Sequence, residues 1–229
     1  MNWTVSALRT ILAVVRDNFG PFFTTSLVLN APLLIVDLID GGIVASLVIG
    51  LIANVLVTVS LTFGTLRAMT GARPDVASLI RQLNRPGSGK LILLVIVQSL
   101  VIGLGLTLVV PGLYVLCLWM VALPAMIVER TTVGGALNRS ANLTRERRWH
   151  VLGAVAGCVL IAVVPLAVIE YLLDEIVGVA SGSTGDLILS WLTEAAMTTV
   201  LATLPAVLYV VLRGEKQGTT LPQIVTALD

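Results

Sequence analysis

Charged residues are scarce in this chain of 229 residues: only 12% are Asp, Glu, Lys or Arg, and there is a single histidine. A soluble domain has about 25% charged and about 45–50% apolar residues, whereas 57% of this chain is hydrophobic and its mean hydropathy is +1.00. So much apolar surface cannot all be buried in one core, so part of its surroundings must be lipid. The near-neutral charge excludes the strongly basic face that nucleic-acid binding requires.

Groups that could carry chemistry are also few. Cys117 and Cys158 lie inside apolar runs, and their spacing fits no metal motif. The sequence contains no glycine-rich phosphate loop, no His-Glu-x-x-His motif and no Gly-x-Ser-x-Gly motif. We therefore expect neither an enzyme nor a resident cofactor or metal.

What the chain has instead is a set of apolar stretches. A helix needs about 20 residues, with a range of about 17–25, to cross a bilayer. We expect a single all-α integral membrane domain over 1–229, with six spans at about 19–39, 43–66, 91–110, 112–128, 150–172 and 187–212. The third and fourth meet at Pro111-Gly112, which predicts a tight antiparallel turn; one kinked helix over 91–128 would be nearly twice the length needed.

The charges support the count of six. With six spans, all fourteen basic residues fall on one side: Arg9, Arg16, Arg67, Arg73, Arg81, Arg85, Lys90, Arg130, Arg139, Arg145, Arg147, Arg148, Arg213 and Lys216. The other side carries Asp37, Asp40, Glu170, Asp174, Glu175 and Asp186. Because basic loops remain cytoplasmic, we expect an inner-membrane, multi-pass protein with both termini in the cytoplasm.

The segments on the basic side are amphipathic. Residues 4–18, 74–83, 131–144 and the tail from 221 to 228 each repeat apolar residues at helical spacing. We expect short surface helices that alternate with three helical hairpins. Gly153 and Gly157 form a Gly-x-x-x-Gly pair in the fifth span, which indicates close helix packing inside the bundle.

Polar groups inside spans are candidate functional residues, because burying them in lipid is costly. Glu194 is the first candidate, since it lies several residues into the sixth span and no basic residue is available on that side. It either lines a proton or cation site or lies at the wet interface. Asn30, Asn54 and Gln98 either line a pathway or hydrogen-bond between helices. Arg145, Arg147 and Arg148 are candidates for contact with lipid head groups.

One region carries a motif. It runs from Pro124 and Glu129 through Arg139-Ser140 and Thr144 to Trp149. Two further stretches agree with the same pattern: residues 16–21, at the entry to the first span, and residues 209–213, at the exit from the last span. This pattern resembles the YciC-like membrane proteins and the related glycerophosphoryl diester phosphodiesterase membrane-domain family. The resemblance implies a prokaryotic cytoplasmic-membrane protein of six helices, without the catalytic barrel to which such domains are fused in that family.

Within the motif, we expect Glu129 to pair with Arg139 or Arg148 and so hold the surface helix against the bundle. The function we predict is that of an accessory or scaffold protein that contacts membrane lipids or other membrane proteins. The alternative is a small transporter or lipid-handling protein that uses Glu194. A transporter requires a polar cavity near the midplane that Glu194 faces, whereas a scaffold requires a packed interior.

Overall fold

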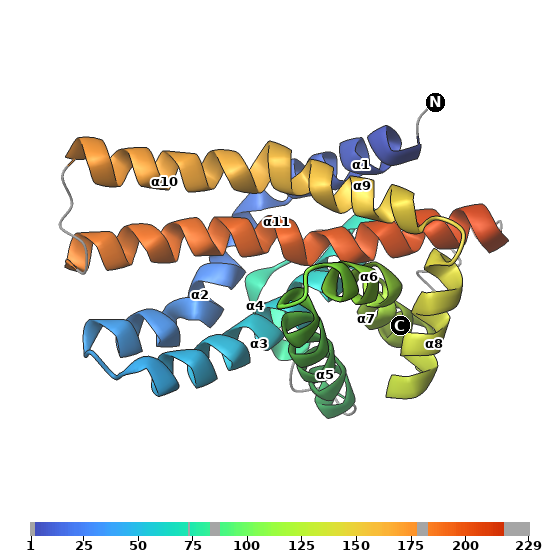
Figure 1. The fold of residues 1–229 in the computed structure, drawn as a ribbon, viewed down its shortest axis with the longest axis horizontal. Helices are drawn as coiled ribbons and strands as arrows, with labels where there is room; N and C mark the ends of the chain where they lie inside the picture. Colours follow the sequence, from blue (N-terminus) through green and yellow to red (C-terminus); the bar gives the residue numbers. More distant parts are fainter. Residues whose placement is uncertain (1–2, 73, 83–87, 178–182, 218–229) are drawn as a thin grey trace.

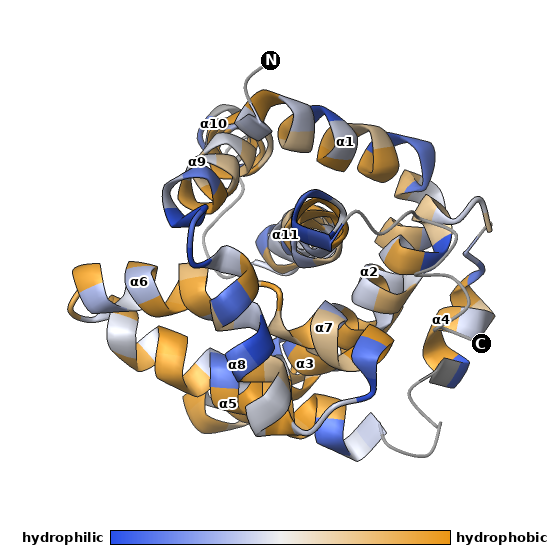
Figure 2. Ribbon diagram, turned by 90° about the vertical axis from the view of Figure 1, so that its right-hand side faces the viewer, coloured by the Kyte–Doolittle hydropathy of each residue, from blue (hydrophilic) through white to orange (hydrophobic). Residues whose placement is uncertain are grey.

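Helix α11 (Thr184–Gln217) runs through the centre of the molecule, and the other helices surround it (Figure 2). The computed structural model describes residues 3–72, 74–82, 88–177 and 183–217. Over these residues the chain is helical, in the order α1 (Trp3–Asp17), α2 (Phe19–Leu38), α3 (Ile43–Met69), α4 (Val76–Gln82), α5 (Ser88–Leu106), α6 (Val110–Trp119), α7 (Ala122–Glu129), α8 (Val133–Thr144), α9 (Arg148–Cys158), a π-helical turn at Val159–Val163, α10 (Val164–Val177) and α11.

Six helical stretches of the described chain are long and apolar enough to span a membrane, as predicted: Phe19–Leu38, Ile43–Met69, Ser88–Leu106, Val110–Glu129, Arg148–Leu173 and Thr184–Gln217. They pair as hairpins, with α2 against α3, α5 against α6 and α10 against α11. The prediction of an all-α polytopic fold is confirmed. The last stretch has 34 residues, so it extends well beyond the predicted 187–212.

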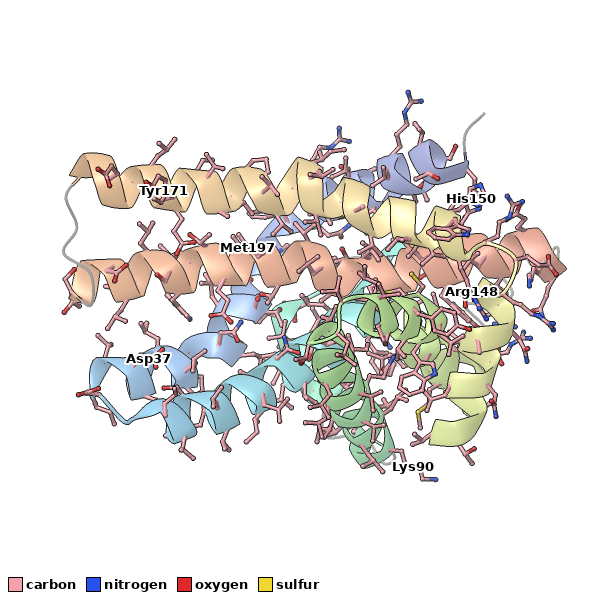
Figure 3. All side chains as sticks on the ribbon, in the orientation of Figure 1. Asp37, Lys90, Arg148, His150, Tyr171 and Met197 are labelled. Carbon is pink, nitrogen blue, oxygen red and sulfur yellow. The ribbon has the colours of Figure 1, made fainter. Side chains whose placement is uncertain are left out.

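The surface helix α8 and the end of α11 meet at one end of the bundle, at the right of Figure 1, whereas α4 lies nearer the middle. We call the end where α8 and α11 meet the basic end, because Arg139 on α8, Arg213 on α11 and Arg148 lie there. The α2–α3 turn with Asp37 and Asp40 lies at the opposite end, which we call the acidic end (Figures 1 and 3). Three of the predicted amphipathic segments are α1, α4 and α8; the fourth, at 221–228, falls outside the described residues.

The glycine pair of the fifth span packs inside the molecule, as expected. A Cβ on Gly153 would lie 3.5 Å from Thr4, and one on Gly157 would lie 2.7 Å from Leu8. Both contacts are to α1. The two glycines therefore let the N-terminal helix lie against α9.

The α5–α6 hairpin turns even more tightly. A Cβ on Gly112 would lie 2.3 Å from the backbone nitrogen of Leu106, whereas one on Gly103 would meet nothing within 4 Å. Val109, in the turn, has a φ of 54°, which β-branched residues rarely adopt. The predicted hairpin is thus present, but its turn is formed by residues 107–109, and Pro111 and Gly112 lie in the first turn of α6. The close approach of the two helices depends on glycine at 112.

Gly112→Ala should lower the stability of the protein, because the added methyl group collides with backbone that cannot move away. Overpacking of this kind costs about 1–3 kcal/mol. The midpoint of thermal unfolding in detergent micelles measures the loss. Gly103→Ala, in the same hairpin, is the control and should have little effect; equal midpoints for the two variants would contradict this account of the turn.

Candidate functional site

The fourth span is broken where Pro124 requires it. Proline has no N–H, and its ring collides with the carbonyl of the residue four positions earlier, which here is Met120. α6 ends at Trp119, and α7 begins at Ala122. The helical hydrogen bonds resume where the N–H of Ala125 donates to Val121 at 3.1 Å. Pro124 therefore lies in the first turn of a new helix, where its missing N–H does least harm.

The break lies in the protein interior, where Val121 and Ala122 are fully buried, so the carbonyl groups that it leaves free must find partners within the protein. The Ser140 hydroxyl donates to the carbonyl of Leu118 at 2.8 Å and accepts from the N–H of Val121 at 3.3 Å. The Gln98 amide donates to the carbonyl of Trp119 at 2.6 Å. Ser140 of the motif and Gln98 thus both complete the hydrogen bonding of this break. Of the two roles expected for Gln98, the structure shows the hydrogen bond between helices.

Glu129, at the end of α7, is the centre of a second set of contacts. Its Oε1 accepts from Arg139 Nε at 2.9 Å and from the Tyr209 hydroxyl at 3.0 Å. The Tyr209 oxygen in turn accepts from Arg213 Nη1 at 2.7 Å. We call these four residues the basic-end network. It joins α7, α8 and α11, and it confirms the predicted pairing of Glu129 with Arg139.

The local sequence aims α8 back toward α7. Arg130 ends α7 in the left-handed conformation, with φ of 50°, which reverses the chain direction. Thr132 then caps α8 by accepting from the N–H of Gly135 at 3.2 Å. One face of α8 carries Ala136, Ser140, Leu143 and Thr144, all of them buried. The Thr144 hydroxyl donates to the carbonyl of Ser140 at 3.0 Å. The side chain of this motif residue therefore makes its hydrogen bond within α8.

The remaining motif residue, Trp149, is 82% exposed at the start of α9. A tryptophan in this position is typical of the interface between membrane and water, where its ring meets the head-group region. Trp149 therefore differs from Glu129 and Ser140, which make contacts within the fold.

The three arginines predicted to contact lipid head groups have different surroundings. Arg145 is exposed. Arg147 forms an ion pair with Glu215, and it lines a surface pocket of about 700 Å³ together with Trp3, His150 and Glu215. Arg148 donates to the Tyr114 hydroxyl at 2.7 Å, and its guanidinium lies 4.9 Å from the centre of that ring. Figure 3 shows Arg148 and His150 at the basic end.

The four polar residues predicted inside the spans fall into two pairs. Asn54 and Gln98 line one cleft of about 340 Å³ between α3, α5, α7 and α11, together with Thr58 and Ser99. Glu194 is not among its lining residues. The cleft is otherwise mainly apolar, with Leu106, Met120, Leu123 and Pro205 in its walls.

Asn30 belongs with Glu194. Its buried amide donates to Ser26 at 3.4 Å, and Ser26 shares a hydrogen bond of 2.8 Å with Thr198. The Thr198 hydroxyl donates to the backbone carbonyl of Glu194 at 2.8 Å. The Glu194 side chain is exposed on the surface of the protein, with the acidic side chains of Asp37 and Glu170 near it.

Sequence reasoning missed several partners in these contacts. Tyr209 and Arg213 were recognised only as part of a motif-like end, and Tyr114 and Glu215 were not singled out. The signal for Tyr209 was a phenol placed four residues before an arginine near the end of an apolar span. This spacing puts both side chains on one face of a helix, but the acceptor of the Tyr209 hydroxyl, Glu129, is 80 residues away.

The fold and these contacts define a polytopic helical membrane protein. Residues 90–212 match the family described as the membrane domain of glycerophosphoryl diester phosphodiesterase. The chain belongs to this family, as the resemblance implied. Comparisons with curated proteins and with solved structures give no match.

The pairing of Glu129 with Arg139 predicts coupled effects of mutation. Glu129→Gln and Arg139→Met should each lower the unfolding midpoint, because hydrogen bonds to charged groups contribute about 1.5–3 kcal/mol. The double variant should lose clearly less than the sum of the two. Arg145→Met, which removes an exposed arginine from the same segment, is the control. Additive losses at Glu129 and Arg139 would contradict the pairing.

Ser140→Ala tests the hydrogen bonding of the break separately. It should destabilise the protein by about 1–3 kcal/mol, because the carbonyl of Leu118 loses its partner away from water. Ser99→Ala removes a hydroxyl from the adjacent cleft, and there we expect a smaller change in the unfolding midpoint. A Ser140→Ala protein as stable as Ser99→Ala would show that the contact carries no stability.

Proposed function

We propose that this protein is a non-catalytic component of a prokaryotic cytoplasmic membrane that binds anionic lipid at its basic end. Its basic end faces the cytoplasm in this proposal, so both termini are cytoplasmic. The argument for this orientation is the distribution of charge, because lysine and arginine are retained on the cytoplasmic side.

The proposal rests on a difference among the polar residues of the basic end: some are hydrogen-bonded within the fold, and others are exposed. Glu129, Arg139 and Ser140 are engaged in contacts that fix α7 and α8. This use supports a structural role for the motif. Arg145, by contrast, is exposed close to the exposed Trp149.

A head-group pocket adjoins this surface. Arg147 and His150 line it from the start of α9, and Trp3 and Thr4 line it from the start of α1. The rings of Trp3 and His150 meet edge to face with their centres 5.9 Å apart. A lipid phosphate would meet the Arg147 guanidinium there, in competition with Glu215. Basic residues near an anionic surface contribute about 1 kcal/mol each.

The lipid proposal is tested by native mass spectrometry of the protein with phosphatidylglycerol and with phosphatidylcholine. We expect preferential retention of phosphatidylglycerol, and an approximately fivefold loss of affinity for each of Arg145→Gln and Arg147→Gln, which corresponds to about 1 kcal/mol per residue. Glu215→Gln should increase binding, because it frees Arg147. Arg81→Gln is the charge-matched control on α4. Equal binding of the two lipids would contradict the proposal.

The second candidate function, a small transporter or lipid-handling protein, is favoured by one observation. Glu194 is a carboxylate within an apolar span, and the hydrogen-bonded chain from Asn30 through Ser26 and Thr198 reaches its backbone. Glu194→Gln in reconstituted vesicles tests it. A flux or lipid-transfer activity that falls with this variant would favour the second function, whereas an unchanged activity would remove its best residue.

A further inference from the structure

The α5–α6 hairpin lies across the bundle rather than along it. Figure 2 looks along α11, which is seen end on, whereas α5 and α6 are seen from the side. In Figure 1 the turn between α5 and α6 lies near the middle of the length of α11, far from the acidic end of the molecule. The 19 residues of α5 would extend about 28 Å. The helix is therefore long enough to cross a bilayer. It does not reach the acidic end because it is inclined to α11.

The contacts of the turn place it at the same depth. Leu106, the last residue of α5, lines the cleft that also contains Asn54 and Pro205. Asn54 lies near the middle of α3, many residues away from the α2–α3 turn at the acidic end. The end of α5 thus reaches only the middle of the neighbouring helix α3.

The sequence of the turn also differs from that of the α2–α3 turn at the acidic end. Residues 91–128 contain no charged side chain and no histidine. Leu104, Leu108 and Val110 are 74%, 71% and 74% exposed. The α2–α3 turn carries Asp37 and Asp40, as expected for a turn in water. The α5–α6 turn, Thr107, Leu108 and Val109, carries no charge, which fits a position inside the hydrocarbon.

From these observations we propose that α5 and α6 form a re-entrant hairpin, which enters the membrane from the basic end and turns back within it. Acyl chains of the leaflet at that end cover its exposed side. Protein interfaces have a polar rim, whereas the exposed side chains along α5 and around the turn are mainly apolar, with Lys90 at the start of α5 and Thr107 in the turn as the polar ones. The exposed apolar residues are Leu93, Leu100, Val101, Leu104, Leu106, Leu108, Val109 and Val110. This surface suits acyl chains rather than a second copy of the protein.

The inference goes beyond the proposed function and does not depend on it. It holds whichever side of the membrane the basic end faces. It changes the membrane topology, because the chain then enters the membrane in α5 and returns in α6 to the side from which it came, so this hairpin does not cross the bilayer.

Single cysteines at three depths test the hairpin, in a background that lacks Cys117 and Cys158. Leu108→Cys places the thiol at the turn. Gly89→Cys, at the start of α5, is the control for the basic end, because a Cβ there meets nothing within 4 Å. Thr184→Cys, exposed at the start of α11, is the control for the acidic end. A membrane-impermeant maleimide is applied to each side of proteoliposomes in turn.

We expect Gly89→Cys to react only from the basic side, Thr184→Cys only from the acidic side, and Leu108→Cys from neither. A bimane attached to Leu108→Cys should then be quenched more strongly by lipids with a nitroxide deep in the acyl chain than by lipids with a head-group nitroxide. Reaction of Leu108→Cys from the acidic side, or stronger head-group quenching, would overturn the proposal in favour of a complete span. A bimane quenched by neither lipid would show that protein covers the turn.

Discussion

The structure depends on one constraint: inside a membrane, each backbone N–H and C=O group must find its partner within the protein. Pro124 removes a backbone donor from the fourth span and breaks the helix next to it. The carbonyls of Leu118 and Trp119 then receive hydrogen bonds from Ser140 on α8 and Gln98 on α5. The break next to this one proline is thus bridged by hydrogen bonds from the surface helix α8 and from α5 of the crosswise hairpin.

The basic-end network holds α7 and α8 together at the other end of α7, away from the helix break. Glu129 lies at the end of α7, and its partners Arg139 and Tyr209 belong to α8 and α11. The Tyr209 side chain is fully buried, so its hydroxyl must find its hydrogen-bond partners within the protein. Charge-assisted hydrogen bonds of this kind are stronger than neutral ones. Glu129, Arg139 and Ser140 of the motif therefore hold α7 and α8 in place in this chain.

Much of this arrangement could be predicted from the sequence. The hydrophobic lengths predict six apolar helices. The α5–α6 hairpin, whose turn lies at 107–109 just before Pro111-Gly112, and the packing of Gly153 and Gly157 follow from local residues alone. Even the pairing of Glu129 with Arg139 was accessible, because a carboxylate at the end of a span and an arginine on the next amphipathic helix lie close in sequence. The contact of Tyr209 with Glu129 was not, because it joins segments 80 residues apart.

Other features were hidden because the sequence records residue types but not helix inclination. Length and hydropathy are the same for an upright span and for the crosswise α5. Likewise Asn30, Asn54, Gln98 and Glu194 are equivalent as polar residues in spans. Only the fold separates Gln98 at the helix break from Asn30 in the α2–α11 contact.

The central claim is that Ser140 compensates for the helix break that Pro124 causes. The stability of Ser140→Ala measured in two backgrounds, natural Pro124 and Pro124→Ala, tests it most directly. Alanine restores the N–H, so the span can continue through the break and the carbonyl of Leu118 can be paired within its own helix. The account predicts that Ser140→Ala costs about 1–3 kcal/mol with Pro124 and much less with Pro124→Ala. An equal loss in both backgrounds would contradict it.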